Sequence, residues 1–279
     1  MGAASRWTPL RGGRTNRLWQ VSRPHGDIVI KLFTGPSNNP LFPNDPASEI
    51  LALQHLETQG IAPRFVDHFQ VGSDTCLVYE HLPGQGWQAG AAKVAELLYR
   101  VHQLPPPQNL RRAANGSLAL QHQTRTILAA CPKPRARDLH MLAPTEHASG
   151  NGPSRFLHGD PVPANIIAHT ETLRLIDWQC PATGDPCEDI SIFLSPAMQV
   201  TYRGAVLRTK EVDAFLTAYP DQQVIKRYHR LAPWYHWRMA AYCLWQECRG
   251  DPVARRAGAA EIDALQASIA AQEDAVYSV

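Results

Sequence analysis

The stretch from Phe156 to Gln179, FLHGDPVPANIIAHTETLRLIDWQ, constrains this chain more than any other part of it. Asp160 stands two residues after a histidine, Asn165 follows five residues later, and Asp177 ends an apolar run. Transfer of a phosphoryl group requires a carboxylate that orients the acceptor hydroxyl and hard oxygen ligands that hold magnesium on the triphosphate. The spacing therefore predicts a phosphoryl-transfer loop, with Asp160 in the first role and Asn165 and Asp177 in the second.

A purely local explanation exists for each of these residues taken singly. His158 and Asp160 could form a turn with side-chain to backbone hydrogen bonds, and Asp177 could simply end a strand. Several features agree in order and in context, however, and this agreement favours the catalytic interpretation.

The motif HGDPVPAN, followed by IDW and GDPCED, resembles the aminoglycoside phosphotransferase and choline kinase superfamily of small-molecule kinases. The resemblance extends over nearly the whole chain, with Pro161 and Ala164 as departures inside the loop and Trp178 in place of the usual phenylalanine. It implies an α+β, protein-kinase-like fold of two lobes. A small antiparallel-sheet lobe with one helix, residues 1–83, would bind nucleotide, and a larger, mainly helical lobe, residues 84–279, would carry catalysis and acceptor binding.

Composition describes a soluble globular protein: 279 residues, 44% hydrophobic and 19% charged. A net charge of +2 is too small to predict nucleic acid or an anionic membrane as the main partner. The six cysteines include no C-x-x-C pair, and no apolar run has the length of a signal or membrane-spanning segment. We therefore expect a cytoplasmic protein with reduced thiols; the sequence does not indicate its oligomeric state.

Near the N-terminus, alternation and strand-forming residues predict a hairpin of strands 17–22 and 28–33. The run GGRTN precedes it, and paired glycines let backbone N–H groups approach phosphate closely, although a GG turn also occurs in ordinary hairpins. This run resembles the nucleotide-covering loop of choline and thiamine kinase-like proteins. The matching residues are Gly12, Gly13, Thr15 and Asn16.

Lys31 lies inside the second strand of that hairpin, and alternation alone would point its side chain to solvent. The resemblance implies instead that it contacts the α and β phosphates and is held by an acid on the next helix. That helix is expected over 47–59, with Glu49 in its first turn. The alternative role of Glu49 is compensation of the helix dipole.

Two strands are expected around the turn Gly72-Ser73-Asp74, and the segment that follows them would join the two lobes. By resemblance, the backbone from Glu80 to Leu82 would bond the adenine edge, and Gly84 would relax the chain into the second lobe. Helical spacing predicts helices over 91–103 and 118–131, whereas the Pro- and Arg-rich segment 131–140 reads as a solvated loop.

The most aromatic segment is 232–247, APWYHWRMAAYCLWQE. As a helix, it would have one aromatic face and a polar back formed by His236, Cys243 and Glu247. Such a face is commonly core, but it could also line an acceptor pocket and attract a cation. The candidate acceptor-binding residues are Trp234, Trp237, Tyr242 and Trp245.

The leading prediction is an ATP- and magnesium-dependent kinase that phosphorylates a hydroxyl of a small, cationic acceptor. The runs GGRTN and AELLYRVHQ are most similar to thiamine kinase and choline kinase-like proteins. An aminoglycoside or sugar kinase is one alternative, and a catalytically silent nucleotide-binding scaffold is another. Retention of Lys31, Asp160, Asn165 and Asp177 argues against the silent alternative.

Overall fold

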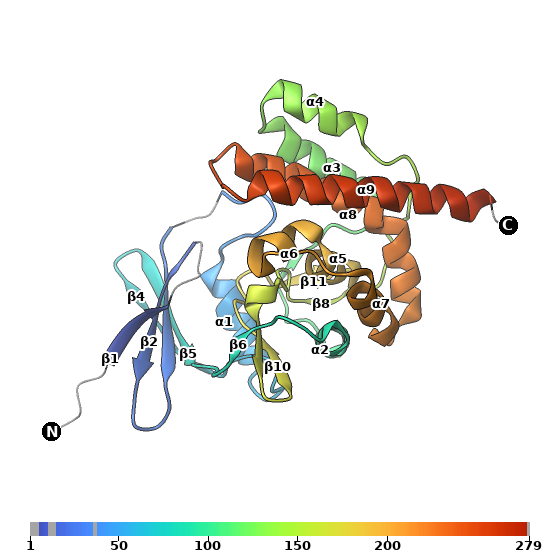
Figure 1. The fold of residues 1–279 in the computed structure, drawn as a ribbon. Helices are drawn as coiled ribbons and strands as arrows, with labels where there is room; N and C mark the ends of the chain where they lie inside the picture. The colour runs from blue at the N-terminus through green and yellow to red at the C-terminus, as the bar shows by residue number, and fades with distance from the viewer. Residues whose placement is uncertain (1–5, 11–14, 36–37, 278–279) are drawn as a thin grey trace. The chain divides into compact units, whose positions relative to one another are not determined.

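The computed structural model describes residues 6–10, 15–35 and 38–277 (Figure 1). Its contacts divide the chain into two compact units. The first unit comprises residues 1–87, 107–110 and 164–181, and the second comprises 88–106, 111–163 and 182–279. The stretch 1–83 thus falls within the first unit, while 84–279 contributes to both. Assignment of the two lobes to nucleotide binding and to catalysis stays a prediction.

An antiparallel sheet with the strand order β1-β2-β3-β5-β4 forms most of the first unit. Its strands are β1 (Arg6–Leu10), β2 (Arg17–Ser22), β3 (Ile28–Phe33), β4 (Phe65–Val71) and β5 (Asp74–Glu80). The predicted β2–β3 hairpin and the turn between β4 and β5 are confirmed. Strand β1, which contains Pro9, was not predicted. It is an edge strand, where a proline removes no bond that the sheet needs.

Helix α1 (Pro46–His55) packs against β4 and β5. Asp45 begins it: its side chain accepts a hydrogen bond from the N–H of Ala47 at 3.0 Å, and Pro46 occupies the first turn, where no N–H is required. The helix ends four residues before the predicted position at Gln59. Its first turn carries Glu49, as expected.

A second, three-stranded sheet of the first unit has the order β10-β9-β6. These strands are β6 (Gln85–Gly86), β9 (Ile166–His169) and β10 (Thr172–Leu175), and a 3-10 turn (Pro163–Asn165) precedes β9. Gly84 adopts a φ of +139°, and a Cβ atom there would lie 2.4 Å from the carbonyl oxygen of Ala168. This glycine therefore allows close contact between two backbone segments.

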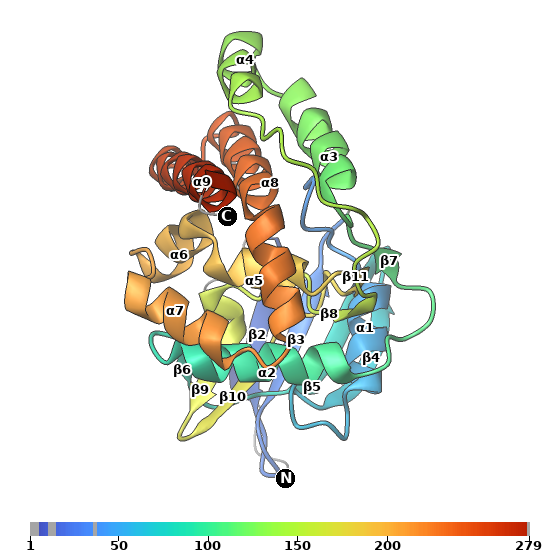
Figure 2. The ribbon, with the colours of Figure 1, turned by 90° about the vertical axis from the view of Figure 1, so that its right-hand side faces the viewer.

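The second unit is mainly helical around a small sheet, β7-β11-β8 (Figure 2). Its strands are β7 (Arg111–Arg112), β8 (Arg155–Leu157) and β11 (Ala182–Gly184). Its helices are α2 (Ala91–Gln103), α3 (Ser117–Ala129), α4 (Lys133–Met141), α5 (Cys187–Leu194), α6 (Pro196–Arg203), α7 (Thr209–Ala218), α8 (Gln222–Glu247) and α9 (Ala254–Tyr277). Helix α8 packs against α9, α3 and α5, and α2 packs against α7. None of the helices over the described residues combines the length and hydropathy of a membrane-spanning segment.

The prediction of a solvated loop over 131–140 is wrong, because most of this segment forms α4. Pro134 lies in the first turn, where a helix tolerates proline, and Ala136 and Leu139 supply a buried side. The sequence-based prediction gave the prolines and arginines too much weight and missed this short apolar side.

Helix α8 is ten residues longer at its start than predicted and contains Pro233. Proline cannot donate to the carbonyl four residues earlier, which belongs to His229. The side chain of Gln272 in α9 donates to that carbonyl oxygen at 3.0 Å. A neighbouring helix thus supplies the bond that the proline removes, and α8 continues through it.

We predict that Gly84→Ala destabilises the protein by about 2–5 kcal/mol, because the new methyl group adds overlap with a backbone carbonyl to the strain of a positive φ. Gly90→Ala is a matched control: its φ is +87°, and nothing lies within 4 Å of the added Cβ. The control should cost about 1–2 kcal/mol in denaturant unfolding. Equal losses in the two variants would contradict the proposed overlap.

Candidate active site

Lys31 forms the centre of a buried charge cluster in the first unit. Its Nζ lies 2.6 Å from an oxygen of Glu49 and 2.5 Å from an oxygen of Asp177. The residue is 1% exposed, so the solvent-facing orientation suggested by alternation is wrong and the expected pair with Glu49 is present. Two carboxylates compensate the ammonium charge that the strand buries.

Burial and the attraction between opposite charges shift the pKa values of this cluster in opposite directions. Burial disfavours the ammonium form of Lys31, but Asp177 and Glu49 more than offset it and hold its pKa above the ordinary value. Burial raises the pKa of Glu49 to about 7, although Lys31 and a backbone bond from Trp178 lower it. Glu49 has to share its ammonium partner with Asp177, whose negative charge also raises the pKa of Glu49.

Asp177 has an unusual backbone conformation, with a φ of +63°. A non-glycine residue in this region is strained, and such strain is concentrated at functional sites. The N–H of Ile176 donates to the carbonyl oxygen of Asn165 at 2.9 Å, which fixes the backbone beside Asp177 relative to Asn165. The Asp177 side chain remains 31% exposed.

Asn165 and Asp177 offer amide and carboxylate oxygens, the hard donors that magnesium prefers. Over the part of the chain that the structure describes, no three His, Cys, Asp or Glu side chains gather into a metal-binding group. This donor set fits an ion that takes its other ligands from phosphate and water.

Asn16 links the start of β2 to more distant parts of the first unit. Its Nδ2 donates to Gln179 Oε1 at 2.9 Å and to Asn44 Oδ1 at 2.8 Å. Sequence reasoning missed Gln179 and Asn44, since no periodicity connects residues as far apart as Asn16 and Gln179. Thr15 is exposed beside Asn16. The predicted phosphate contacts of Gly12 and Gly13 fall outside the described residues.

At the end of β5, the N–H of Glu80 donates to the backbone carbonyl of Arg64 at 2.9 Å. The N–H of His81 donates to the backbone carbonyl of Asp27, also at 2.9 Å. Tyr79, which sequence reasoning also missed, is buried near Lys31. Burial raises the pKa of this phenol, although the Lys31 charge opposes the shift. Adenine contacts by Glu80 or Leu82 would have to use groups other than these two N–H donors.

The loop before Asp160 is anchored inside the second unit by Asp189. The two carboxylate oxygens of Asp189 accept the backbone N–H groups of His158 and Gly159, each at 2.8 Å. The N–H of Asp160 in turn donates to His158 Nδ1 at 3.2 Å. His102 Nε2 lies 3.1 Å from Asp189 and helps to hold it in place. Asp189 fixes the loop geometry without occupying the predicted catalytic position.

Asp189 remains ionised although it is completely buried. Burial opposes its charged form, but the hydrogen bond and charge of His102, the charge of His158 and the Gly159 N–H bond hold its pKa below the ordinary value. His102 is itself bonded through Nδ1 to the hydroxyl of Tyr219 at 2.8 Å. The loop thus rests on a connected buried network that includes α2, α5 and the end of α7.

The aromatic face of α8 lies in the interior of the second unit. Trp234 and Trp237 are each 0% exposed, and both indole N–H groups donate to backbone carbonyls, those of Glu146 and Leu139, at 2.7 Å. These contacts are those of core residues, the first of the two roles considered for the aromatic face. Tyr242 and Trp245 stack on each other with centroids 5.8 Å apart and are also buried.

The predicted polar back of α8 is not solvated as expected, because α9 packs against this helix. His236 Nδ1 lies 2.7 Å from Glu261 of α9, and Cys243 is 4% exposed. A Cβ on Gly258 would lie 3.1 Å from that of Cys243. A small residue, Gly258, and a buried hydrogen-bonding carboxylate, Glu261, thus allow α9 to cover a face that sequence alone assigned to solvent.

A comparison with protein families identifies the fold. Residues 6–234 match the family described as phosphotransferase enzyme family, APH. The chain belongs to this family. The match confirms the predicted superfamily, and the enzyme is a small-molecule kinase with a hydroxyl acceptor. None of the curated proteins compared with this kinase matches its sequence significantly.

Solved structures resemble the kinase over nearly its whole length. Choline kinase from Cryptosporidium parvum has a TM-score of 0.67 at 13% identity, covering 96% of this chain and 91% of that one. A choline/ethanolamine kinase family protein from Mesorhizobium loti gives 0.64 at 16%, covering 95% and 88%. A thermostable mutant of aminoglycoside phosphotransferase APH(4)-Ia, in a ternary complex with AMP-PNP and hygromycin B, gives 0.62 at 13%, covering 94% of each chain. These similarities confirm the α+β, protein-kinase-like fold.

We predict that Asp189→Asn destabilises the kinase by about 2–4 kcal/mol, because one of two buried N–H donors then faces an amide NH₂ group. The folded protein keeps Asp189 ionised to lower pH than the unfolded chain does. The ionised Asp189 therefore contributes fully to the free energy of unfolding above the ordinary pKa of 3.8. This contribution is lost as the pH falls through the lower pKa of the folded state. Urea unfolding at several pH values should show that the free energy of unfolding falls less steeply at acid pH in the variant than in the wild type. The exposed Asp213→Asn control should retain the wild-type profile.

Proposed function

We propose that the protein transfers the γ-phosphoryl group of magnesium-bound ATP to a hydroxyl of a small, cationic acceptor. The observation that carries the proposal is the buried Lys31 between Glu49 and Asp177. A lysine buried between two acids, one of them strained and partly exposed, has little use as an ordinary core residue. It suits a site where the ammonium group of Lys31 also binds the oxygens of a polyphosphate.

At the nucleotide, Lys31 binds the α and β phosphates and Glu49 orients its ammonium group. The loop containing Gly12, Gly13, Thr15 and Asn16 covers the phosphates. The carbonyl of Glu80 and the N–H of Leu82 bond the adenine edge. The related APH(4)-Ia mutant was solved with AMP-PNP, which supports ATP as the donor.

Asp177 and the amide oxygen of Asn165 would hold magnesium, whose charge offsets that of the triphosphate when it is bound. Asp160 accepts a hydrogen bond from the acceptor hydroxyl and thereby directs the hydroxyl oxygen at the γ phosphate. During transfer, Asp160 takes up the proton of that hydroxyl. The assignment of these three residues to one reaction rests on their spacing in the sequence. The cysteines among the described residues form no disulfide, which agrees with the cytoplasmic setting that forms part of the proposal.

For the acceptor, we propose a cation recognised by the aromatic side chains of α8: Trp234, Trp237, Tyr242 and Trp245. An aromatic face attracts such a cation by about 0.5–2 kcal/mol per well-placed ring. The choline and choline/ethanolamine kinases among similar structures support this class, while hygromycin B in the APH(4)-Ia complex keeps aminoglycosides as a second candidate. Magnesium-ATP consumption should be measured with choline, ethanolamine, thiamine, sugars and aminoglycosides. Nucleotide binding without turnover on any of them would favour a silent scaffold.

Asp160→Asn should lower kcat by about 10²–10⁴-fold and leave ATP affinity and the melting temperature nearly unchanged. The change removes the carboxylate that accepts the proton and alters little volume. Steady-state kinetics and nucleotide titration measure the two effects separately. The matched Asp213→Asn variant should behave as wild type. Wild-type turnover by Asp160→Asn would disprove the assignment of Asp160.

Asp177→Asn should weaken nucleotide binding in magnesium by about tenfold or more and change metal-free binding much less. Asparagine tolerates the positive φ of this position, so the variant tests the carboxylate with little added backbone strain. Calorimetric titrations with excess magnesium and with a chelator provide the comparison. Equal losses under both conditions would indicate that Asp177 acts through Lys31 and not through a metal.

A further inference from the structure

One segment of the second unit covers the aromatic face of α8. We call residues 133–148, which comprise α4 and the stretch after it, the cover. Trp237 donates to the cover at the carbonyl of Leu139, and Trp234 donates at Glu146. The His147 ring stacks on Trp234 with centroids 5.5 Å apart and planes at 21°. The cover thus contacts both rings, and on Trp234 its His147 occupies one ring face, where a cation would bind.

The cover has few buried side chains for its length. Within α4, only Ala136 and Leu139 are buried among residues that the structure describes in full. Beyond α4, the cover is held at Ser117, whose N–H donates to the carbonyl of Ala148 at 3.0 Å and whose hydroxyl accepts from the Ala148 N–H at 3.1 Å. An element with little buried apolar area opens at low free-energy cost.

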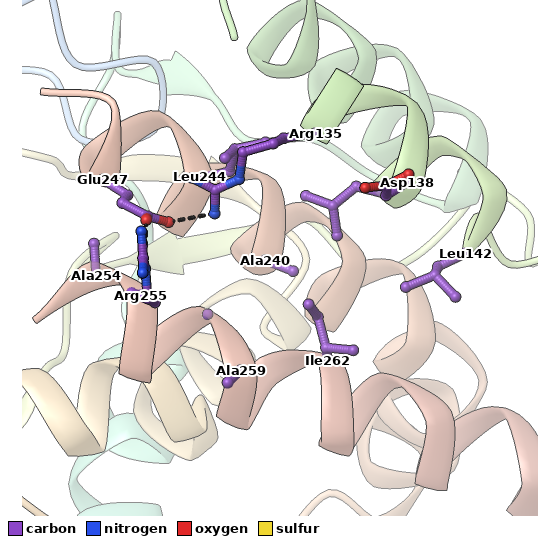
Figure 3. Close-up of a pocket in the computed structure, with 12 residues that line it drawn as sticks. Arg135, Asp138, Leu142, Ala240, Leu244, Glu247, Ala254, Arg255, Ala259 and Ile262 are labelled. Atoms are coloured by element: carbon purple, nitrogen blue, oxygen red, sulfur yellow. Dashed lines mark hydrogen bonds and ion pairs between the residues drawn. The ribbon is translucent and has the colours of Figure 1, made fainter. Parts of the chain in front are cut away.

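An ion pair ties the start of α4 to the end of α8. Arg135 Nη2 lies 2.5 Å from Oε2 of Glu247, and Arg255 of α9 contacts Oε1 of the same carboxylate at 2.8 Å (Figure 3). The Arg135 bond foremost, and the Arg255 bond after it, lower the pKa of Glu247 to about 2, although burial opposes the shift. The carboxylate therefore stays charged and available to both arginines at physiological pH.

Behind this ion pair lies a cavity of about 240 Å³ between α4, α8 and α9 (Figure 3). Leu139 and Leu142 of the cover line it on one side, and small residues such as Ala240 and Ala259 line it on the other. Where this pocket lies, α4 meets solvent and not the side chains of α8 and α9, so it has fewer packing partners than a helix in a filled core.

We propose that the cover is a movable lid over Trp234 and Trp237, latched by the Arg135–Glu247 ion pair, and that a cationic acceptor displaces His147 from Trp234 when it binds. This inference rests on the proposed acceptor site. Opening frees both indole N–H groups together with the face of Trp234 that His147 covers, because Leu139, Glu146 and His147 belong to one continuous segment. Acceptor binding then includes the cost of opening the lid, and loosening the latch lowers that cost.

Hydrogen exchange of the full-length protein tests the latch directly. Arg135→Ala removes the ion pair between the cover and α8, whereas Arg255→Ala removes a similar ion pair between the same Glu247 and α9. Both arginines are substantially exposed, so both variants should fold. We expect amide exchange across 136–148 to become about two- to fivefold faster in Arg135→Ala and to stay unchanged in Arg255→Ala. Equal exchange in the two variants would overturn the latch.

Choline, used as a quaternary ammonium probe and followed by tryptophan fluorescence, tests the link to binding. Arg135→Ala should bind choline about two- to fivefold more tightly than wild type, in proportion to its larger open population. Faster exchange with unchanged choline affinity, or no choline binding by either protein, would overturn the lid as a gate to the acceptor site. Magnesium-ATP turnover on the acceptor panel remains a separate readout, so failure of the lid and failure of the kinase proposal are distinguishable.

Discussion

The burial of one positive charge, that of Lys31, sets the requirements for much of the first unit. An ammonium group inside a sheet is stable only beside carboxylates, and the two that serve it come from α1 and from the segment after β10. Glu49 reaches it because Asp45 and Pro46 begin α1 at the right residue. Asp177 reaches it from a strained backbone, which the bond between Ile176 and Asn165 helps to maintain. Three segments distant in sequence are thus held together by electrostatics.

In the second unit, Asp189 has the corresponding role for the backbone of the HGD loop. A buried carboxylate with backbone donors on both oxygens is rigid, since any rotation leaves an N–H group unpaired. Its other contact, with His102, extends the network to Tyr219. Glu49 and Asp177 thus compensate a side-chain charge, whereas Asp189 fixes a loop.

Sequence patterns predicted β2, β3 and α2 to the residue, because hydrophobic periodicity and turn residues are local properties. The HGD and IDW motifs also pointed to the family that the match over 6–234 establishes. Patterns failed where distant packing decides the outcome. Strand β1 depends on its pairing with β2, and α4 depends on two buried residues. The partners of Asn16 and the covering of α8 by α9 and by residues 133–148 leave no periodic signal in the sequence.

The interruption of α8 by Pro233 has a consequence for how sequences of this type can diverge. The carbonyl of His229 depends on a glutamine amide from another helix, 43 residues further along the chain. Replacing the proline with an ordinary residue would restore the internal helix bond and leave Gln272 only its longer bond, 3.2 Å, to the carbonyl of Arg230. Losing the glutamine first would leave a carbonyl without this donor. Among homologues, we therefore expect the proline and the glutamine to covary, with the proline lost before or together with the glutamine.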